Sequence, residues 1–212
     1  MKNHFLFFAV GLLFLFSCNY DTKEINKKVK VFFDAKEYQK AINELDKLIS
    51  YNGNDTNAYY RRGLAYLYLK NIEEAKSNFD MVISLDSNCI NSYYFRANCR
   101  AARFDTDSAI FDLTCYLKKS ANLKPDEKYT CVYITRGLFY HMKGQNDKAL
   151  CDYMKEIELD STNAQAYFLI GEMKFAQDSS KLEAISYIKK ASVLGYEDAK
   201  QFIKDSVPAC RL

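Results

Sequence analysis

The 212-residue sequence has no tryptophan, only two prolines, seven glycines and two histidines. Strand-rich folds with many tight turns need proline and glycine, so their scarcity argues against an all-β protein and favours a helical one. Two histidines, His4 and His141, leave little material for metal centres or acid–base catalysis. The net charge is only +3 with both signs interspersed, which argues against nucleic acid as a partner. Because 49% of the chain is apolar, with 17 Tyr and 15 Phe, a substantial core is available.

The amino-terminal segment has the layout of a cleavable secretory signal. Lys2 supplies a positive charge, and an uncharged apolar run of 12 residues follows from Phe5 to Phe16. A membrane-spanning helix needs about 20 apolar residues, so this run is too short for a span. We therefore predict that residues 1–17 are a signal peptide.

The end of this segment, Leu15-Phe16-Ser17-Cys18, resembles the lipobox of bacterial lipoproteins. The bulky Phe16 departs from the best-known form of the motif and is similar to variants of Bacteroidota. The resemblance implies that Cys18 is acylated and that residues 18–24 form a lipidated tether; several acyl chains on one residue give stable anchoring. Asn19 stands where an aspartate would favour inner-membrane retention, so the outer membrane is the expected location. An ordinary secretory signal with a chance cysteine, or a buried apolar helix, are the alternatives.

The rest of the chain is organised by an internal repeat. Four alanines at intervals of 34, 34 and 40 residues mark it: Ala41, Ala75, Ala109 and Ala149. A large side chain lies four residues after each: Leu45, Phe79, Leu113 and Tyr153. A small residue lies twelve before the last three: Gly63, Ala97 and Gly137. Small residues let paired helices approach closely while the aromatic residues fill the space around them, so the period predicts stacked helical hairpins.

This pattern resembles the tetratricopeptide repeat, most clearly along Tyr59, Gly63, Tyr66, Ala75 and Phe79. The resemblance covers about residues 22–198. It implies an all-α fold, a right-handed α-solenoid of about five helical hairpins plus a C-terminal capping helix. Such a solenoid presents the first helix of every hairpin on its inner face.

We expect a repeat domain over 25–206 and a tail at 207–212. The expected units lie near 22–55, 56–89, 90–123, 130–163 and 164–198, followed by a capping helix at 197–206. The longer interval of 40 residues places an extra loop at 121–126. That loop is either a neutral surface insertion or a binding loop.

The resemblance also places a set of side chains on the inner face, where a partner would bind. They are Asn57, Tyr60, Leu64, Tyr68, Asn91, Tyr94, Asn98, Ile134, Leu138, His141, Phe168 and Glu172. Aromatic rings supply contact area and amides pair with backbone groups, which suits an extended peptide. We expect about half of the set to face solvent, with Tyr60, Tyr94 and Phe168 the first candidates for plain core.

Charged residues also repeat. Arg62, Arg96 and Arg136 precede the small residue of successive units, and acidic residues follow the anchoring alanine by three at Glu44, Asp112 and Asp152, with Asn78 interrupting the series. Because both series fall on faces that pack between helices, we predict bidentate interhelical pairs and not a ligand site. The spacing does not choose between pairing within a unit and pairing with the following one.

Cysteine and histidine give no sign of catalysis. The cysteines after Cys18 form no CxxC pair and no zinc spacing: Cys89, Cys99, Cys115, Cys131, Cys151 and Cys210. Export would permit disulfides, although most of these residues are expected to be small buried hydrophobes. A nucleophile paired with His141 would need a nearby cysteine and an orienting carboxylate, and nothing local supplies them.

We therefore predict a non-catalytic scaffold, held to the cell envelope by its lipid anchor, that binds a protein or peptide and needs neither metal nor cofactor. Two alternatives remain. A small-ligand or glycan-binding lipoprotein would need a closed aromatic pocket. An envelope enzyme would need a cluster of perturbed titratable groups.

Overall fold

The computed structural model describes residues 21–121, 131–177 and 181–206, and every regular element in these ranges is a helix. In chain order they are α1 (Thr22–Asp34), α2 (Tyr38–Tyr51), α3 (Thr56–Tyr68), α4 (Ile72–Leu85), α5 (Ile90–Ala101), α6 (Thr106–Ser120), α7 (Val132–Met142), α8 (Asn146–Leu159), α9 (Ala164–Ala176), α10 (Lys181–Val193) and α11 (Glu197–Ser206). The expected signal peptide, Cys18, most of the extra loop and the tail lie outside the described residues.

The turn inside each hairpin has the same chemistry in the first four hairpins. Two or three residues after the end of the first helix, the chain adopts a positive φ, at Lys36, Lys70, Phe104 and Gly144. The next amide N–H then donates back to a carbonyl five residues earlier, as from Asn71 to Tyr66 at 2.9 Å and from Gln145 to Tyr140 at 2.9 Å. This is the Schellman ending of a helix, which satisfies carbonyls that have no partner within it. The turn therefore stops each first helix at a fixed place.

Polar side chains start several of the helices. Asp55 accepts a hydrogen bond from the Ala58 amide at 2.9 Å, and Asn163 accepts one from Ala166 at 3.2 Å. Each such cap satisfies an amide that the helix itself leaves free. Asp21 does the same for α1, so residues 22–24, where the expected tether and the expected first unit overlap, are helical.

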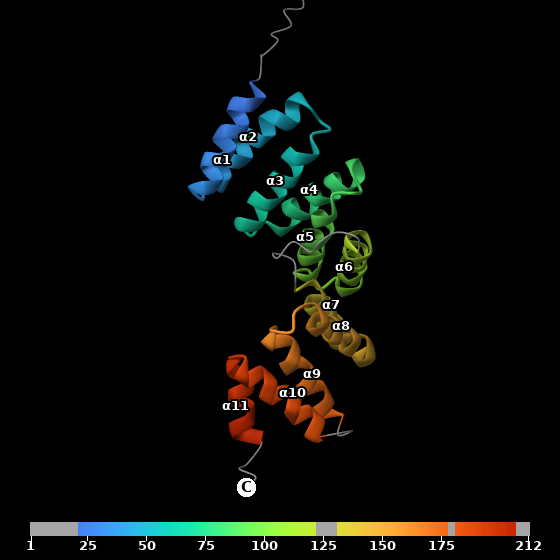
Figure 1. The fold of residues 1–212 in the computed structure, drawn as a ribbon. Coiled ribbons are helices and arrows are strands. Elements are labelled where there is room, and N and C mark those ends of the chain that lie inside the picture. The colour runs from blue at the N-terminus through green and yellow to red at the C-terminus, as the bar shows by residue number, and fades with distance from the viewer. Residues whose placement is uncertain (1–20, 122–130, 178–180, 207–212) are drawn as a thin grey trace, which may run out of the picture.

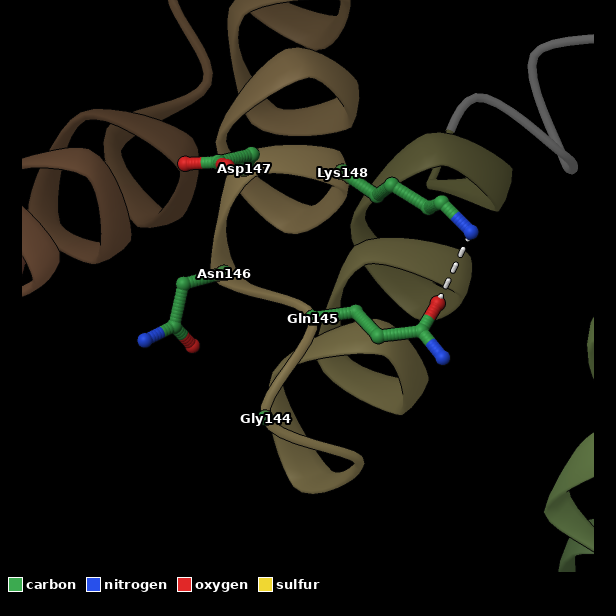
Figure 2. Close-up of a pocket in the computed structure, with 5 residues that line it drawn as sticks. All are labelled: Gly144, Gln145, Asn146, Asp147 and Lys148. Atoms are coloured by element: carbon green, nitrogen blue, oxygen red, sulfur yellow. Dashed lines mark hydrogen bonds between the residues drawn. The ribbon is translucent and has the colours of Figure 1, made fainter.

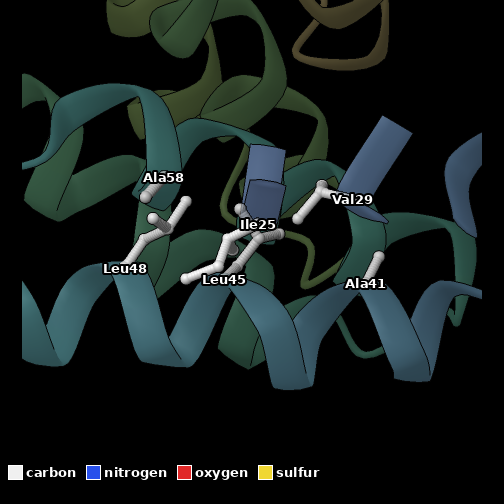
Figure 3. Close-up of a cluster of buried hydrophobic side chains, with 6 residues drawn as sticks. All are labelled: Ile25, Val29, Ala41, Leu45, Leu48 and Ala58. Carbon is white, nitrogen blue, oxygen red and sulfur yellow. The ribbon is translucent and has the colours of Figure 1, made fainter. Parts of the chain in front are cut away.

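The hairpins stack in one curved row, with α1 and α11 at opposite ends (Figure 1). The core is divided accordingly into clusters between neighbouring hairpins. Figure 3 shows the first cluster, where α1, α2 and α3 contribute Ile25, Val29, Ala41, Leu45, Leu48 and Ala58. No hairpin buries its apolar face alone, which is the reason a solenoid needs neighbours. The prediction of an all-α stack is confirmed over the described residues.

The last helix closes the apolar end of this row. Ala199 of α11 is fully buried, and Phe202 and Ile203 pack against the cluster that contains Phe168 and Ile188. The opposite face of α11 carries exposed charged and polar side chains. A polar outer face is what a terminal unit of a repeat array requires.

Candidate binding face

The candidate site is the face formed by the first helices of the hairpins, α3, α5, α7 and α9. Of the twelve side chains expected there, four are exposed: Asn57, Tyr68, His141 and Glu172. Six are half-buried: Tyr60, Leu64, Asn91, Tyr94, Asn98 and Leu138. Ile134 and Phe168 are buried, with 3% and 7% of their surface exposed. Phe168 was a first candidate for core, whereas the expectation for Ile134 was wrong. Both point into the stack because the next helices cover them.

Tyr68 is the most exposed aromatic side chain of the expected set, at 60%. Its ring stacks on that of Tyr38 from α2, with ring centroids 4.5 Å apart and planes 9° apart. One ring face is therefore held by the protein while the rest meets solvent. Tyr38 is not in the predicted set of binding residues, because it belongs to the second helix of its hairpin and the set was drawn from first helices.

Tyr60 and Tyr94 join the core with one side of each ring. Tyr60 meets the edges of Phe79 and Phe95 with centroids 6.0 and 5.9 Å apart, and Tyr94 lies 5.5 Å from Phe95. Edge-to-face contacts of this kind stabilise a core beyond the area they bury. These two tyrosines are thus supports of the face at least as much as binding groups.

Two exposed members of the expected set, His141 of α7 and Glu172 of α9, lie together at a pocket of about 250 Å³. The other lining residues are Tyr153, Leu169, Met173 and Ala176. The pocket thus lies between two successive first helices, with α8 behind it. None of these four additional residues was expected in the site; only the stacking of α7, α8 and α9 brings them together.

The polar groups of this pocket have shifted acid–base properties. Burial raises the pKa of Glu172, and the nearby Asp198 carboxylate raises it further, while His141 lowers it. Burial, with the charges of Asp152 and Glu172, raises the pKa of Tyr153 to about 12. Tyr153 is completely buried, and its hydroxyl has no hydrogen-bond partner among the described residues.

His141 is held at the rim by a neighbour. Its Nδ1 lies 3.1 Å from the amide oxygen of Asn146. An amide oxygen only accepts, so Nδ1 is the donor in this contact. The pocket therefore combines an apolar wall with a carboxylate, a phenol oxygen and an imidazole ring at its rim.

A second hollow, of about 320 Å³, is a feature of one turn and not of the binding face. Figure 2 shows its five consecutive lining residues, Gly144, Gln145, Asn146, Asp147 and Lys148. Lys148 donates to the Gln145 side chain at 3.0 Å, while Asn146 and Asp147 point the other way. Its polar side chains do not converge, so it offers no defined ligand position.

The repeated arginines bind to the protein itself. Arg96 pairs with Asp112 through two hydrogen bonds of 2.9 and 2.6 Å, and Arg136 pairs with Asp152 at 2.8 and 2.6 Å. This confirms the predicted bidentate pairs and places them within each unit. Each arginine also donates to a residue of the preceding unit, so the guanidinium links two hairpins. Those second partners are Asp46 for Arg62, Asp80 for Arg96 and Thr114 for Arg136.

Comparisons with known proteins agree with this geometry. The family model "Tetratricopeptide repeat" matches residues 56–89, which contain α3 and α4. Among solved structures, a crystal structure of MamA matches with a TM-score of 0.71 and 22% identity, covering 81% of this chain and 96% of that one. MamA from Desulfovibrio magneticus RS-1 matches at 0.72 and 19% identity, covering 82% and 95%. YrrB, titled a TPR protein with an unusual peptide-binding site, matches at 0.71 and 19%, covering 85% and 90%. No curated protein sequence matches the chain.

The fold is a tetratricopeptide-repeat solenoid. In the terms of that fold, the pocket lies on the side of the first helices, between the fourth and fifth repeats. Arg96 and Arg136 pair within their own repeats and also donate to the preceding repeat, so each guanidinium links two repeats. The tetratricopeptide-repeat fold alone names no partner, because one fold serves many functions.

Three further features of the described residues concern thiols, metal binding and membrane insertion. Among the cysteines there, Cys99 is buried, whereas Cys131 and Cys151 are exposed. Over the same residues, no group of three or more His, Cys, Asp or Glu side chains is arranged to hold a metal ion. None of the helices described is long and apolar enough to cross a membrane.

Proposed function

We propose that this protein is a non-catalytic tetratricopeptide-repeat scaffold that binds a protein or peptide in the bacterial cell envelope. The observation that carries the proposal is the contrast between the two kinds of repeated side chain. The repeated arginines are paired inside the stack, whereas aromatic, amide and acidic groups on α3, α7 and α9 remain exposed. A face with aromatic and amide groups suits an extended peptide. The match to YrrB, whose title names a peptide-binding site, supports the same reading.

The membrane anchor is the second half of the proposal, and it rests on the sequence. The run from Phe5 to Phe16 followed by Ser17 and Cys18 supports lipidation at Cys18. Asn19 after the cysteine favours the outer membrane. The described structure begins at Asp21, with α1 starting directly after it. The solenoid would therefore stand close to the membrane surface.

Crosslinking in native membranes, followed by affinity purification, tests the scaffold. We expect a reproducible protein partner that is lost when Tyr68, Asn98 and Leu138 are replaced together by alanine. Phe111→Ala is the matched control, because this aromatic residue is 61% exposed but lies on the second helix α6. Retention of the partner by the triple variant, or catalytic turnover by the purified protein, would contradict the proposal. Specific capture of a glycan in place of a protein would favour the small-ligand alternative.

Fractionation of cells tests the anchor. Cys18→Ser should move the protein from the membrane fraction to the soluble fraction, because the acyl chains have no other attachment point. Cys131→Ser removes an exposed thiol of the solenoid and should leave the distribution unchanged. An unchanged distribution for Cys18→Ser would mean that the lipobox reading is wrong.

A further inference from the structure

One buried position of the repeat changes its chemistry in the fourth hairpin. This position, four residues after the anchoring alanine, is occupied by Leu45, Phe79, Leu113 and Tyr153. All four side chains are fully buried. Only Tyr153 brings a polar atom there, and its hydroxyl has no partner among the described residues. A buried hydroxyl without a hydrogen bond is costly, so a bound group that supplies one gains affinity.

The pocket exists because two neighbours of this position are smaller here than in the second hairpin. Phe79 lies between Tyr60 and Phe95, whose ring centroids are 6.0 and 5.4 Å from its own. The residues at the corresponding positions around Tyr153 are Ile134 and Leu169. Leu169 places less volume beside the phenol than Phe95 places beside Phe79. Part of the volume that aromatic rings fill between α3 and α5 is therefore pocket between α7 and α9.

The mouth of the pocket carries the carboxylate of Glu172. Glu172 stands where the other repeats have Leu64, Asn98 and Leu138. It forms no ion pair with any described residue, and the charge that acts on it most strongly, Asp198, has the same sign. Lys174, the nearest basic residue on α9, is already paired with Glu183 at 3.0 Å. A cation bound here would relieve the repulsion between two carboxylates.

We propose that the pocket lined by His141, Tyr153 and Glu172 binds a lysine or arginine side chain of the partner peptide. The aliphatic stem packs on Leu169, Met173 and Ala176. The cationic head donates hydrogen bonds to the Glu172 carboxylate and to the Tyr153 oxygen. This inference rests on the proposed function, since it names the anchor residue that a bound peptide would carry.

Other side chains fit the pocket less well. An acidic side chain would meet Glu172 and Asp198 and be repelled. A purely aliphatic or aromatic side chain would bury the Glu172 carboxylate and leave the Tyr153 hydroxyl without a partner. A charge-assisted hydrogen bond is about twice as strong as a neutral one, so a cationic head gains most from these acceptors.

Binding of side-chain analogues to the intact protein tests the pocket directly. The probe is N-acetyl-lysine methylamide, and the readout is the ¹³C-methyl NMR resonance of Met173, with Met81 of α4 as the internal control. N-acetyl-norleucine methylamide keeps the stem without the charge, and N-acetyl-glutamate methylamide reverses the charge. We expect the lysine probe to shift Met173 but not Met81, with the norleucine probe about tenfold weaker and the glutamate probe inactive.

Three variants borrow side chains from other repeats or conserve size, so they keep the fold. Tyr153→Phe copies Phe79 and should weaken lysine binding by about three- to tenfold. Glu172→Gln should weaken it by about tenfold or more. Leu169→Phe copies Phe95 and should abolish it by filling the pocket. Equal binding of norleucine and lysine, preference for glutamate, or full binding by Leu169→Phe would each overturn the proposal.

The proposed pocket and the proposed scaffold function can be contradicted independently of each other. If the lysine probe binds as expected but no protein partner is recovered from membranes, the pocket stands and the scaffold function falls. If a partner is recovered equally well with Leu169→Phe, the scaffold stands and the pocket is not its anchor site.

Discussion

The second hairpin, α3 and α4, and the fourth, α7 and α8, have the same backbone plan but different interiors. Two buried positions that hold Phe79 and Val82 in α4 hold Tyr153 and Glu156 in α8. Both polar residues keep an unpartnered atom among the described residues, the Tyr153 hydroxyl and Glu156 Oε2. The other Glu156 oxygen accepts from Asn163 at 3.0 Å. These two positions are therefore apolar in the second hairpin, whereas in the fourth hairpin they hold polar groups whose burial lowers the stability.

The comparison indicates that the residues that form the repeat pattern differ from those that line the proposed pocket. The small residues and the turns recur in both hairpins, and in both an arginine of the first helix donates to the second helix. Tyr153 and Glu172 depart from the pattern and line the pocket between α7 and α9, whereas Glu156 does not line it. Proteins depart from local folding rules chiefly at functional sites, which is consistent with the proposed role of this pocket.

The largest effect is expected from breaking the arginine link in each hairpin. Asp152→Ala leaves Arg136 partly buried without its bidentate partner, and we expect a loss of about 3 kcal/mol in the free energy of unfolding. Asn78→Ala removes a neutral acceptor of Arg62 and a donor to the Glu74 carbonyl, but Arg62 keeps its ion pair with Asp46, so a smaller loss of about 1 kcal/mol is expected. Urea unfolding followed by far-ultraviolet circular dichroism measures both. Equal losses would mean that the two links are energetically alike.

The next effect depends on pH. Burial raises the pKa of Glu156 from 4.5 to about 7 in the folded protein. The pKa of Glu156 is higher in the folded protein than in the unfolded chain. Its contribution to the free energy of unfolding is therefore most favourable below the unfolded pKa, and this advantage is lost as pH rises through the folded pKa. Glu156→Gln should therefore stabilise the protein by about 2 kcal/mol near pH 8 and by almost nothing near pH 4.

Thermal unfolding of Glu156→Gln across this pH range gives the measurement. The exposed Glu158, on the same helix and paired with Lys155, supplies the control Glu158→Gln, whose effect should not change sign or grow across neutral pH. A Glu156→Gln advantage that is the same at both ends of the range would contradict the assigned cause.

The third prediction exchanges the residues that pack on Tyr153 and Phe79, which are Leu169 and Phe95. Leu169→Phe adds a ring over Tyr153 and should stabilise the protein by about 1 kcal/mol, since aromatic pairs contribute about that much beyond their buried area. Phe95→Leu removes the corresponding ring over Phe79 and should cost at least as much. The denaturant midpoints of the two variants measure both changes in stability. Destabilisation by Leu169→Phe would show that the pocket is too small for a ring.

The smallest effect concerns the turns. Lys70 and Gly144 occupy the same place with φ values of 61° and 69°. A side chain with a Cβ is strained there and glycine is not. Lys70→Gly should therefore stabilise the second hairpin by about 0.5–1 kcal/mol, and Gly144→Ala should destabilise the fourth by about 1 kcal/mol. Hydrogen exchange of the α3 and α7 amides resolves effects of this size.

The solenoid could be predicted from the sequence because its determinants are local and repeated. Helical spacing, the small residues and the turn residues act over a few positions, and their recurrence every 34 residues removes the ambiguity of any single match. The pairing of Arg96 could not be chosen from spacing. In the structure its guanidinium reaches Asp112 in its own unit and Asp80 in the preceding one, so neither single partner describes it.

The site was predicted less well than the fold. Ile134 and Phe168 were placed on the inner face by analogy of position, yet the neighbouring helices bury them. His141 and Glu172 were both named, but nothing in the chain indicated that they share a pocket. Tyr153 and Leu169 were missed, although a tyrosine at a position that holds leucine or phenylalanine elsewhere was visible in the repeat alignment.

The sequence by itself determined the helical hairpins, their register and their order, because backbone hydrogen bonds and apolar periodicity act within one hairpin. Only the tertiary structure decided which side chains remain accessible, how each arginine is shared, and where a pocket opens. Those outcomes depend on the size of side chains brought together from three different helices. A pocket arises between α7 and α9 because Leu169 fails to fill what Phe95 fills between α3 and α5.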